Sequence, residues 1–148
     1  MPPIPDSILT AASLDEALTE ILKHFAADSG TIHLLEDDGL LHLKAASAGI
    51  PELVLQTVRT IPVGKGMAGL AVERTQPVTA CNIQNDTSGD VRPGAKLTGL
   101  EGAIVVPMMR AARAAGALGI ANRAERTFSG DEERLLLAIG AHLAGRHA

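Results

Sequence analysis

The chain has 148 residues, which is the size of one domain with a substantial core, and we expect a single folded unit. Its 46% hydrophobic and 20% charged residues are typical of a globular protein, and no apolar run approaches the roughly 18 residues of a membrane span, so no membrane partner is expected. The net charge of −4, with Lys and Arg scattered singly, argues against a nucleic-acid partner.

The first twelve residues are rich in proline and are predicted to form an N-terminal arm, with the domain proper over 13–148. They lack the basic and apolar regions of a signal peptide, which predicts a cytoplasmic location. Ser13 and Glu16 have the spacing of a capping box, in which the Ser13 hydroxyl accepts from the Glu16 amide and the Glu16 carboxylate accepts from the amide of the cap residue. A helix with one apolar face starts there and ends before residues 28–30.

Two apolar stretches, 31–35 and 40–47, are separated by the sequence EDDG and predict a β-hairpin. A two-residue turn would place Leu35 opposite His42, which makes His33 and His42 diagonal neighbours about 7 Å apart on one face of the sheet. Two imidazoles are too few for a typical zinc site, and no third ligand is evident nearby, so no metal site is predicted.

The middle of the chain is less regular. Residues 51–57 predict a short helix opened by a proline, residues 60–63 a brief extended piece, and residues 67–73 a second short helix. Residues 77–81 resemble a strand. The polar segment 84–98 that follows has the length of a loop that often covers a binding site.

Residues 103–109 and 115–121 are dense in Val, Ile and Leu and predict a second hairpin. Ser129 and Glu132 form another capping box at the start of the last helix. This order of elements predicts an α+β domain with a central antiparallel sheet, terminal helices on one face, and a ligand pocket under short helices and loops on the other.

Residues 64–69, GKGMAG, match the pattern G-x-G-x-x-G, which occurs in phosphate-binding turns. A dinucleotide fold needs a regular strand before the glycines, but Pro62 removes a ladder donor there, and the predicted helix after them is short. A P-loop needs Lys and Ser or Thr after the last glycine, where this chain has Leu70 and Ala71. We therefore do not expect a phosphate cradle.

The glycine stretch resembles the centre of a GAF domain, the small sensory module of phosphodiesterases, cyclases and bacterial regulators. The likeness extends over nearly the whole chain, and it implies a small-molecule sensor acting in signal transduction, in which the glycines let a short helix wall one side of the pocket. The segments that carry it are 13–18, 61–71, 77–78 with 81–83, 103–108, 116–122 and 128–129.

Two Phe and no Trp or Tyr disfavour a flat aromatic ligand, so we expect a small polar or non-aromatic molecule, whose identity the sequence does not predict. The sequence does not identify a cofactor either. The residues expected around the ligand are apolar Val63, Met67, Leu70, Cys81, Val91, Val106 and Met108, and polar Lys65, Asn82, Asp86, Asp90 and Arg92.

Some relatives reduce free methionine sulfoxide with several cysteines, and an enzyme of this kind using Cys81 is the alternative function. Cys81 is the single cysteine of the chain, so it cannot perform both attack and resolution within one chain, and a buried, inert thiol is the expectation. Asn82 stands where bilin-binding relatives commonly have a histidine, which argues against a covalent pigment. An interaction module with a collapsed pocket is the third possibility.

Asn122, Arg123, Phe128 and Glu132-Glu133 partly match the signature of cyclic-nucleotide-binding relatives. The same residues are also typical of the cap of the last helix, and we expect them to be mainly structural.

A second copy of the chain is an expected partner, and a separate signalling protein is a possible one. Leu135, Ile139 and Leu143 are predicted to face the sheet. Leu136, with the small residues Gly140 and Ala144, would then face a neighbour in a homodimer made by the terminal helices.

Overall fold

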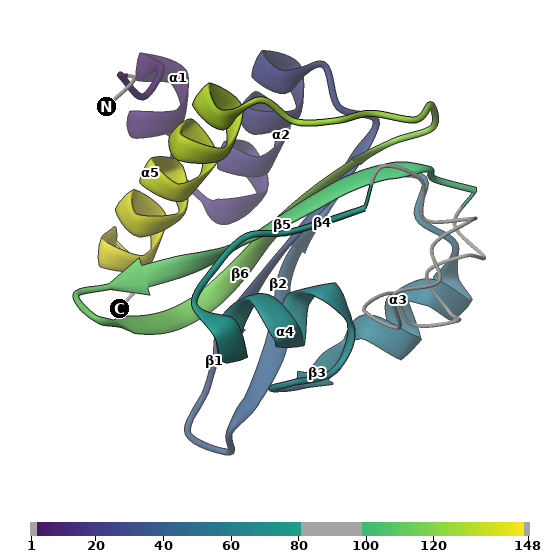
Figure 1. Ribbon diagram of the computed structural model, residues 1–148, viewed down its shortest axis with the longest axis vertical. Helices are drawn as coiled ribbons and strands as arrows, with labels where there is room; N and C mark the ends of the chain where they lie inside the picture. Colours follow the sequence, from purple (N-terminus) through teal and green to yellow (C-terminus); the bar gives the residue numbers. More distant parts are fainter. Residues whose placement is uncertain (1–2, 81–98, 147–148) are drawn as a thin grey trace.

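The fold is a six-stranded antiparallel sheet with helices on both faces, shown in Figure 1 as a computed structural model that describes residues 3–80 and 99–146. The chain is therefore α+β, as the sequence predicted. The strands follow the order β3-β2-β1-β6-β5-β4, with bounds β1 Ser29–Leu35, β2 Leu40–Ala46, β3 Thr60–Pro62, β4 Val78–Ala80, β5 Gly102–Arg110 and β6 Arg113–Asn122.

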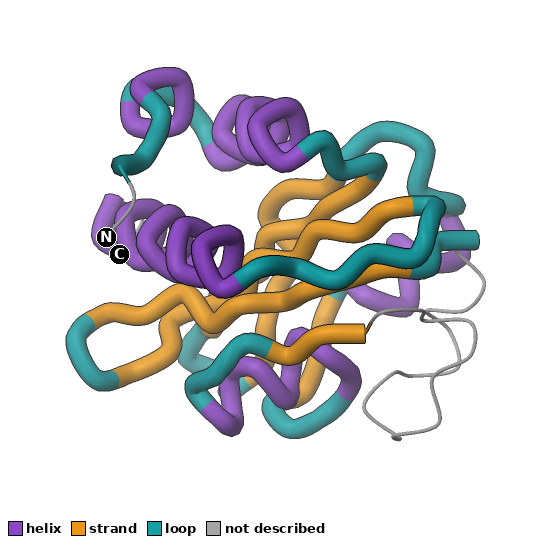
Figure 2. Tube along the Cα trace, turned by 45° about the horizontal axis from the view of Figure 1, so that its top comes forward, coloured by secondary structure: helices purple, strands orange, loops and turns teal. Residues whose placement is uncertain are grey.

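The helices divide into two groups, which Figures 1 and 2 show on opposite sides of the sheet. The terminal group comprises α1 (Asp6–Leu9), α2 (Leu14–Phe25) and α5 (Gly130–Arg146). The group from the middle of the chain comprises α3 (Glu52–Val58) and α4 (Gly66–Arg74). The sheet thus separates a helical layer built from the chain ends from a thinner layer of short helices.

A capping arrangement forms at each predicted helix start, but the first differs from the prediction in the amide that the glutamate binds. The Ser13 hydroxyl accepts from the Glu16 amide at 3.1 Å, and the Glu16 carboxylate accepts from the Ala12 amide at 2.8 Å, one residue before the cap. At the start of α5 the bonds are reciprocal, with Ser129 Oγ accepting from the Glu132 amide at 3.1 Å and the Glu132 carboxylate from the Ser129 amide at 2.9 Å. These bonds satisfy amides that a helix start leaves without partners.

The hairpin β1–β2 forms with a different register from the one expected. The Glu36 amide donates to the Leu40 carbonyl and the Gly39 amide to the Glu36 carbonyl, so the connection has three residues and Gly39 takes a φ of 78°. The extra residue pairs His42 with Leu34, which places His33 and His42 on opposite faces of the sheet. The prediction that His33 and His42 are diagonal neighbours was therefore wrong. The His42 ring instead lies against the carboxylates of Glu36 and Asp38 at the turn.

The helical layer has one continuous core, to which α1, α2, α5 and the sheet all contribute. Ile8 of α1 is fully buried in it, and Arg146 donates to the Leu9 carbonyl, so part of the predicted arm packs onto the domain. Large aliphatic side chains fill this core. The largest fully buried members are Ile8, Leu18, Ile21, Ile32, Ile104, Met108, Leu118, Ile120, Leu136, Ile139 and Leu143.

The face of α5 that we expected to contact a second copy lies inside this core. Leu136 is 1% exposed and Ala144 2% exposed, and a Cβ at Gly140 would stand 3.3 Å from the Met108 side chain. The expectation for Leu136 was wrong because α5 is buried on more than one flank, against the sheet and within the cluster shared with α1 and α2. A helical stripe read from sequence gives no sign of a second covering element.

Leu136→Ala is expected to lower the free energy of unfolding by about 2–5 kcal/mol, the usual cost of truncating a buried leucine. The matched control is Leu53→Ala, since Leu53 is 64% exposed on α3 and its truncation should change stability by no more than about 0.5 kcal/mol. Urea denaturation followed by circular dichroism measures both values. Equal effects of the two substitutions would contradict the placement of α5.

Candidate functional site

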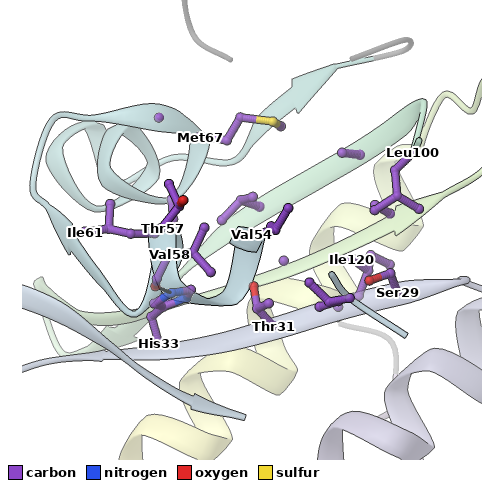
Figure 3. Close-up of a pocket in the computed structure, with 18 of the residues that line it drawn as sticks. Ser29, Thr31, His33, Val54, Thr57, Val58, Ile61, Met67, Leu100 and Ile120 are labelled. Carbon is purple, nitrogen blue, oxygen red and sulfur yellow. Dashed lines mark hydrogen bonds between the residues drawn. The ribbon is translucent and has the colours of Figure 1, made fainter. Parts of the chain in front are cut away.

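A cavity of about 190 Å³ lies on the face of the sheet away from the terminal helices, between the sheet and helices α3 and α4 (Figure 3). Strands β1, β5 and β6 form its floor, and residues of α3 and of the first turn of α4 form its walls. The described residues that line it are Ser29, Gly30, Thr31, His33, Ile50, Val54, Thr57, Val58, Ile61, Lys65, Gly66, Met67, Ala68, Leu100, Ala103, Val105, Gly119, Ile120 and Ala121.

Small residues on β5 and β6 create the space. Ala103 pairs with Ala121 across the two strands, and Val105 pairs with Gly119. A Cβ at Gly119 would meet Val105 Cγ2 at 3.2 Å, so even one methyl group would crowd the floor. Because successive side chains point to opposite faces, the same strands present Ile104, Leu118 and their neighbours to the helical core. The sheet is thus bulky on one face and shallow on the other.

The glycines of residues 64–69 anchor α4 against β3. The Gly64 amide donates to the Gly69 carbonyl at 2.9 Å, and a Cβ at Gly69 would lie 2.4 Å from the Pro62 carbonyl oxygen. Gly64 and Gly66 have φ values of 90° and 64°, which L side chains rarely adopt. Close packing and turn geometry therefore account for the motif, and the first residues of α4 wall the cavity as expected.

The described polar groups of the cavity are mostly engaged within the chain. The Thr57 hydroxyl donates to the Leu53 carbonyl at 2.9 Å, and Ser29 Oγ lies 3.0 Å from Ser47 Oγ. His33, 2% exposed, has Nε2 2.8 Å from the Val58 carbonyl oxygen. A carbonyl only accepts, so Nε2 carries the proton, and Nδ1 is a buried acceptor without a partner among the described residues. Burial lowers the pKa of His33 below its ordinary value, although the bond to Val58 opposes this in part.

The structure brings together only part of the predicted ligand site. Lys65 and Met67 line the cavity, whereas Val63 and Leu70 are not among the lining residues. Val106 and Met108 are fully buried in the core under the terminal helices, on the opposite face, so their assignment to the pocket was wrong. The remaining predicted residues lie outside the described part of the chain: Cys81, Asn82, Asp86, Asp90, Val91 and Arg92.

The error at Val106 and Met108 has a simple physical source. Strand β5 is apolar at nearly every position because both of its faces are covered, so hydrophobicity does not distinguish the faces. The residues that sequence reasoning missed lie on β1 and α3, among them Thr31, His33 and Val58. The alternation of Thr31 and His33 with Ile32 and Leu34 was a usable signal for the pocket side of β1.

Three residues of the partial nucleotide-binding signature, Asn122, Phe128 and Glu132, take part in a structural clamp centred on Arg126. Arg126 donates to the Phe25 carbonyl at 2.7 Å and to Asn122 Oδ1 at 2.8 Å, and it pairs with the Glu132 carboxylate at 2.6 Å. Its guanidinium also lies 4.5 Å from the centre of the Phe128 ring. The clamp ties the entrance of α5 to the end of α2, and none of its members lines the cavity.

The described residues 3–80 and 99–146 contain no group of three or more His, Cys, Asp or Glu side chains that could hold a metal ion. Within the same ranges, none of the helices combines the length and hydropathy that a membrane crossing requires.

A family model described as GAF domain matches residues 11–145. The chain belongs to the GAF domain family. None of the curated protein sequences compared with it is similar enough to count as a relative.

Solved structures of GAF domains share the fold at low sequence identity. The GAF domain of an Acinetobacter phosphoenolpyruvate-protein phosphotransferase has a TM-score of 0.75 and 22% identity, covering 95% of this chain and 85% of that one. A type II free methionine-R-sulfoxide reductase from Thermoplasma acidophilum has a TM-score of 0.73 and 21% identity, with coverage of 89% and 87%. A domain assigned to a two-component sensor histidine kinase from Sinorhizobium meliloti has a TM-score of 0.69 and 18% identity, covering 88% of this chain and 85% of that one. These likenesses establish the fold.

The buried histidine predicts a pH dependence of stability. The pKa of His33 is lowered in the folded state, so below its ordinary value of 6.5 the unfolded chain binds a proton that the folded chain does not. His33 therefore makes the free energy of unfolding fall as pH drops below about 6.5, with a slope of at most about 1.4 kcal/mol per pH unit until the folded pKa is reached.

We expect His33→Gln, which keeps an N–H for the Val58 carbonyl, to flatten this slope between pH 7.5 and 5. The control is His24→Gln, since His24 is exposed on α2 and its replacement should leave the wild-type slope in place. Denaturant unfolding at a series of pH values measures the slope of the unfolding free energy against pH for each variant. A wild-type slope in His33→Gln would show that His33 is not the titrating group.

Proposed function

We propose that this GAF domain is a non-catalytic sensor that binds a small molecule in the cavity between the sheet and helices α3 and α4, and that it acts in signal transduction. The observation that carries the proposal is the cavity itself, because its described lining is mainly apolar and includes two short helices that a ligand would contact directly. The fold is also that of a domain assigned to a sensor histidine kinase, which is consistent with a regulatory role.

Helix α3 is the wall best suited to respond to a ligand. Val54 and Val58 face the cavity, while Leu53 on the same helix is 64% exposed. Its bond to the sheet runs from His33 to the Val58 carbonyl, and α3 makes few other contacts with described elements. Weakly packed elements open at low free-energy cost, so a ligand that fills the cavity can order this wall.

A second chain is the proposed route by which the signal leaves the domain. A homodimer through the terminal helices stays a prediction, and it needs exposed positions of α5 such as Arg134 and Ala141 in place of the buried Leu136. A separate signalling protein and a location in the cytoplasm are parts of the same proposal.

Native mass spectrometry of the purified protein should reveal a carried small molecule, and adding that molecule back should raise the melting temperature. At 100 times its Kd a ligand stabilises the folded state by about 2.7 kcal/mol. The control is Ala121→Leu, which fills the floor between β6 and the Met67 and Leu100 side chains. This variant should be folded by circular dichroism but should carry no ligand. A wild-type protein that carries nothing and responds to no metabolite in a panel of amino acids, 2-oxo acids and short-chain alcohols would favour an interaction module without a ligand.

The second candidate is a free methionine sulfoxide reductase. It is favoured by solved reductases of the same fold from Thermoplasma acidophilum and Neisseria meningitidis, at 21% and 19% identity. The reaction converts the sulfoxide and two thiols into methionine, a disulfide and water. The chain's one cysteine cannot form that disulfide alone.

We expect no turnover when the protein is incubated with free methionine sulfoxide and dithiothreitol, with methionine formation measured by chromatography. The control is Cys81→Ser assayed in parallel, since residual reduction by dithiothreitol itself is the same in both. Robust turnover that disappears in Cys81→Ser would replace the sensor function with an enzymatic one.

A further inference from the structure

We propose that the cavity binds an uncharged aliphatic molecule of about five to seven carbon atoms that carries one hydroxyl or carbonyl group, held by the Thr31 hydroxyl. This names the ligand class of the sensing function proposed above and rests on it. Three features of the described lining residues lead to it: the volume, the chemistry of the walls, and the distribution of unused polar atoms.

The volume sets the size. The cavity has a volume of about 190 Å³. Pockets for drug-sized ligands run from about 300 to 1,000 Å³, and this cavity is smaller. A short-chain molecule fits that space, whereas a nucleotide does not.

The walls set the polarity. Val54, Val58 and Ile61 flank the cavity, and Met67 and Leu100 cover it, as Figure 3 shows. Neither these side chains nor the small residues of the floor can pair with a charge. Each methylene group buried against them contributes about a factor of four in affinity, from about 0.8 kcal/mol.

The described lining residues offer no partner for a buried charge. They include no Asp or Glu, so an ammonium group would lie unpaired. Lys65 is also among the described lining residues, but its side chain is exposed to solvent and not buried on the floor. His33 stays neutral in its buried position and already donates to Val58, so it offers no positive charge to an anion on the floor. The described part of the floor therefore suits an uncharged ligand group.

Two polar groups of the described floor remain available: the Thr31 hydroxyl, which can donate or accept, and His33 Nδ1, which can only accept. The Thr31 hydroxyl makes no hydrogen bond with another described residue, unlike the hydroxyls of Ser29 and Thr57. Figure 3 shows its hydroxyl oxygen on the side of the chain that faces Val54 across the cavity. A hydroxyl can donate or accept, so it suits either an alcohol or a carbonyl. The ligand thus needs one such group and an otherwise aliphatic body.

Hexan-1-ol, butan-1-ol and hexylammonium chloride test the proposal by titration into the ¹⁵N-labelled protein, with amide chemical shifts measured by NMR. Saturable shifts of cavity residues with hexan-1-ol, and about fifteenfold weaker binding of butan-1-ol for its two missing methylenes, are expected. Hexylammonium should produce no saturable shift. Hexylammonium binding as tightly as hexan-1-ol, or equal affinity of the two alcohols, would overturn the ligand class.

The matched variant is Thr31→Val, which keeps the β-branched shape and removes the hydroxyl. This substitution should weaken the binding of hexan-1-ol about three- to tenfold, the usual effect of one lost hydrogen bond. It should leave the melting temperature of the free protein nearly unchanged. An unchanged affinity in this variant would overturn the role of Thr31.

The two levels of the proposal fail in different ways. If a charged metabolite from the panel raises the melting temperature while the alcohols do not bind, the aliphatic class is wrong and the sensing function stands. If neither binds and the purified protein carries no molecule, the sensing function fails as well.

Discussion

The central constraint is the difference between the two faces of strands β5 and β6. Both strands are buried on both sides, but one face carries Ile104, Leu118 and Ile120 and the other carries Ala103, Gly119 and Ala121. The bulky face meets the terminal helices and forms the main core. The small residues leave a shallow floor on which α3 and α4 rest without filling the space. The cavity is therefore a consequence of side-chain volume along two strands, set by the period-two alternation of a sheet.

The glycines of the motif G-x-G-x-x-G at residues 64–69 also have a structural cause. Gly69 lies so close to Pro62 that no side chain fits, and Gly64 and Gly66 take positive φ values. The spacing of these glycines serves to bring the start of α4 against β3. Two unrelated structural tasks, cradling an anion and packing a short helix onto a strand, both select glycine for its missing Cβ. The residues on either side of the motif decide which task applies.

Local features were predictable from the sequence, and features that depend on distant partners were not. The capping of both helix starts, the two hairpins and the order of the elements follow from short-range spacing, and each is present in the structure. The prediction of the register of the first hairpin was wrong, because one extra residue in the turn moves His42 to the other face of the sheet relative to His33.

The failures at Leu136, Val106 and Met108 share one cause. Each sits on an element that is covered on more than one side, where nearly every position is apolar and no stripe distinguishes one neighbour from another. Half of the predicted ligand residues lie between 81 and 98, outside the described part of the chain, so the candidate site is known from its floor and its α3 and α4 walls. Thr31 and His33 were accessible to reasoning, since they break the apolar run of β1 in alternate positions.

The placement of the cavity also limits how a bound molecule can influence the rest of the domain. The sheet separates it from α2 and α5, and Ile120 is the described residue that belongs both to the cavity lining and to the core under the terminal helices. Helix α4 is fixed by its glycine turn and packs on β3, β4, β5 and β6, so it resists displacement. Helix α3 is held by Val54, Val58 and the bond from His33, and it presents Leu53 to solvent. A change in the cavity is therefore transmitted most cheaply through α3 to the surface beside it, whereas transmission to the terminal helices requires movement at Ile120 in a densely packed core.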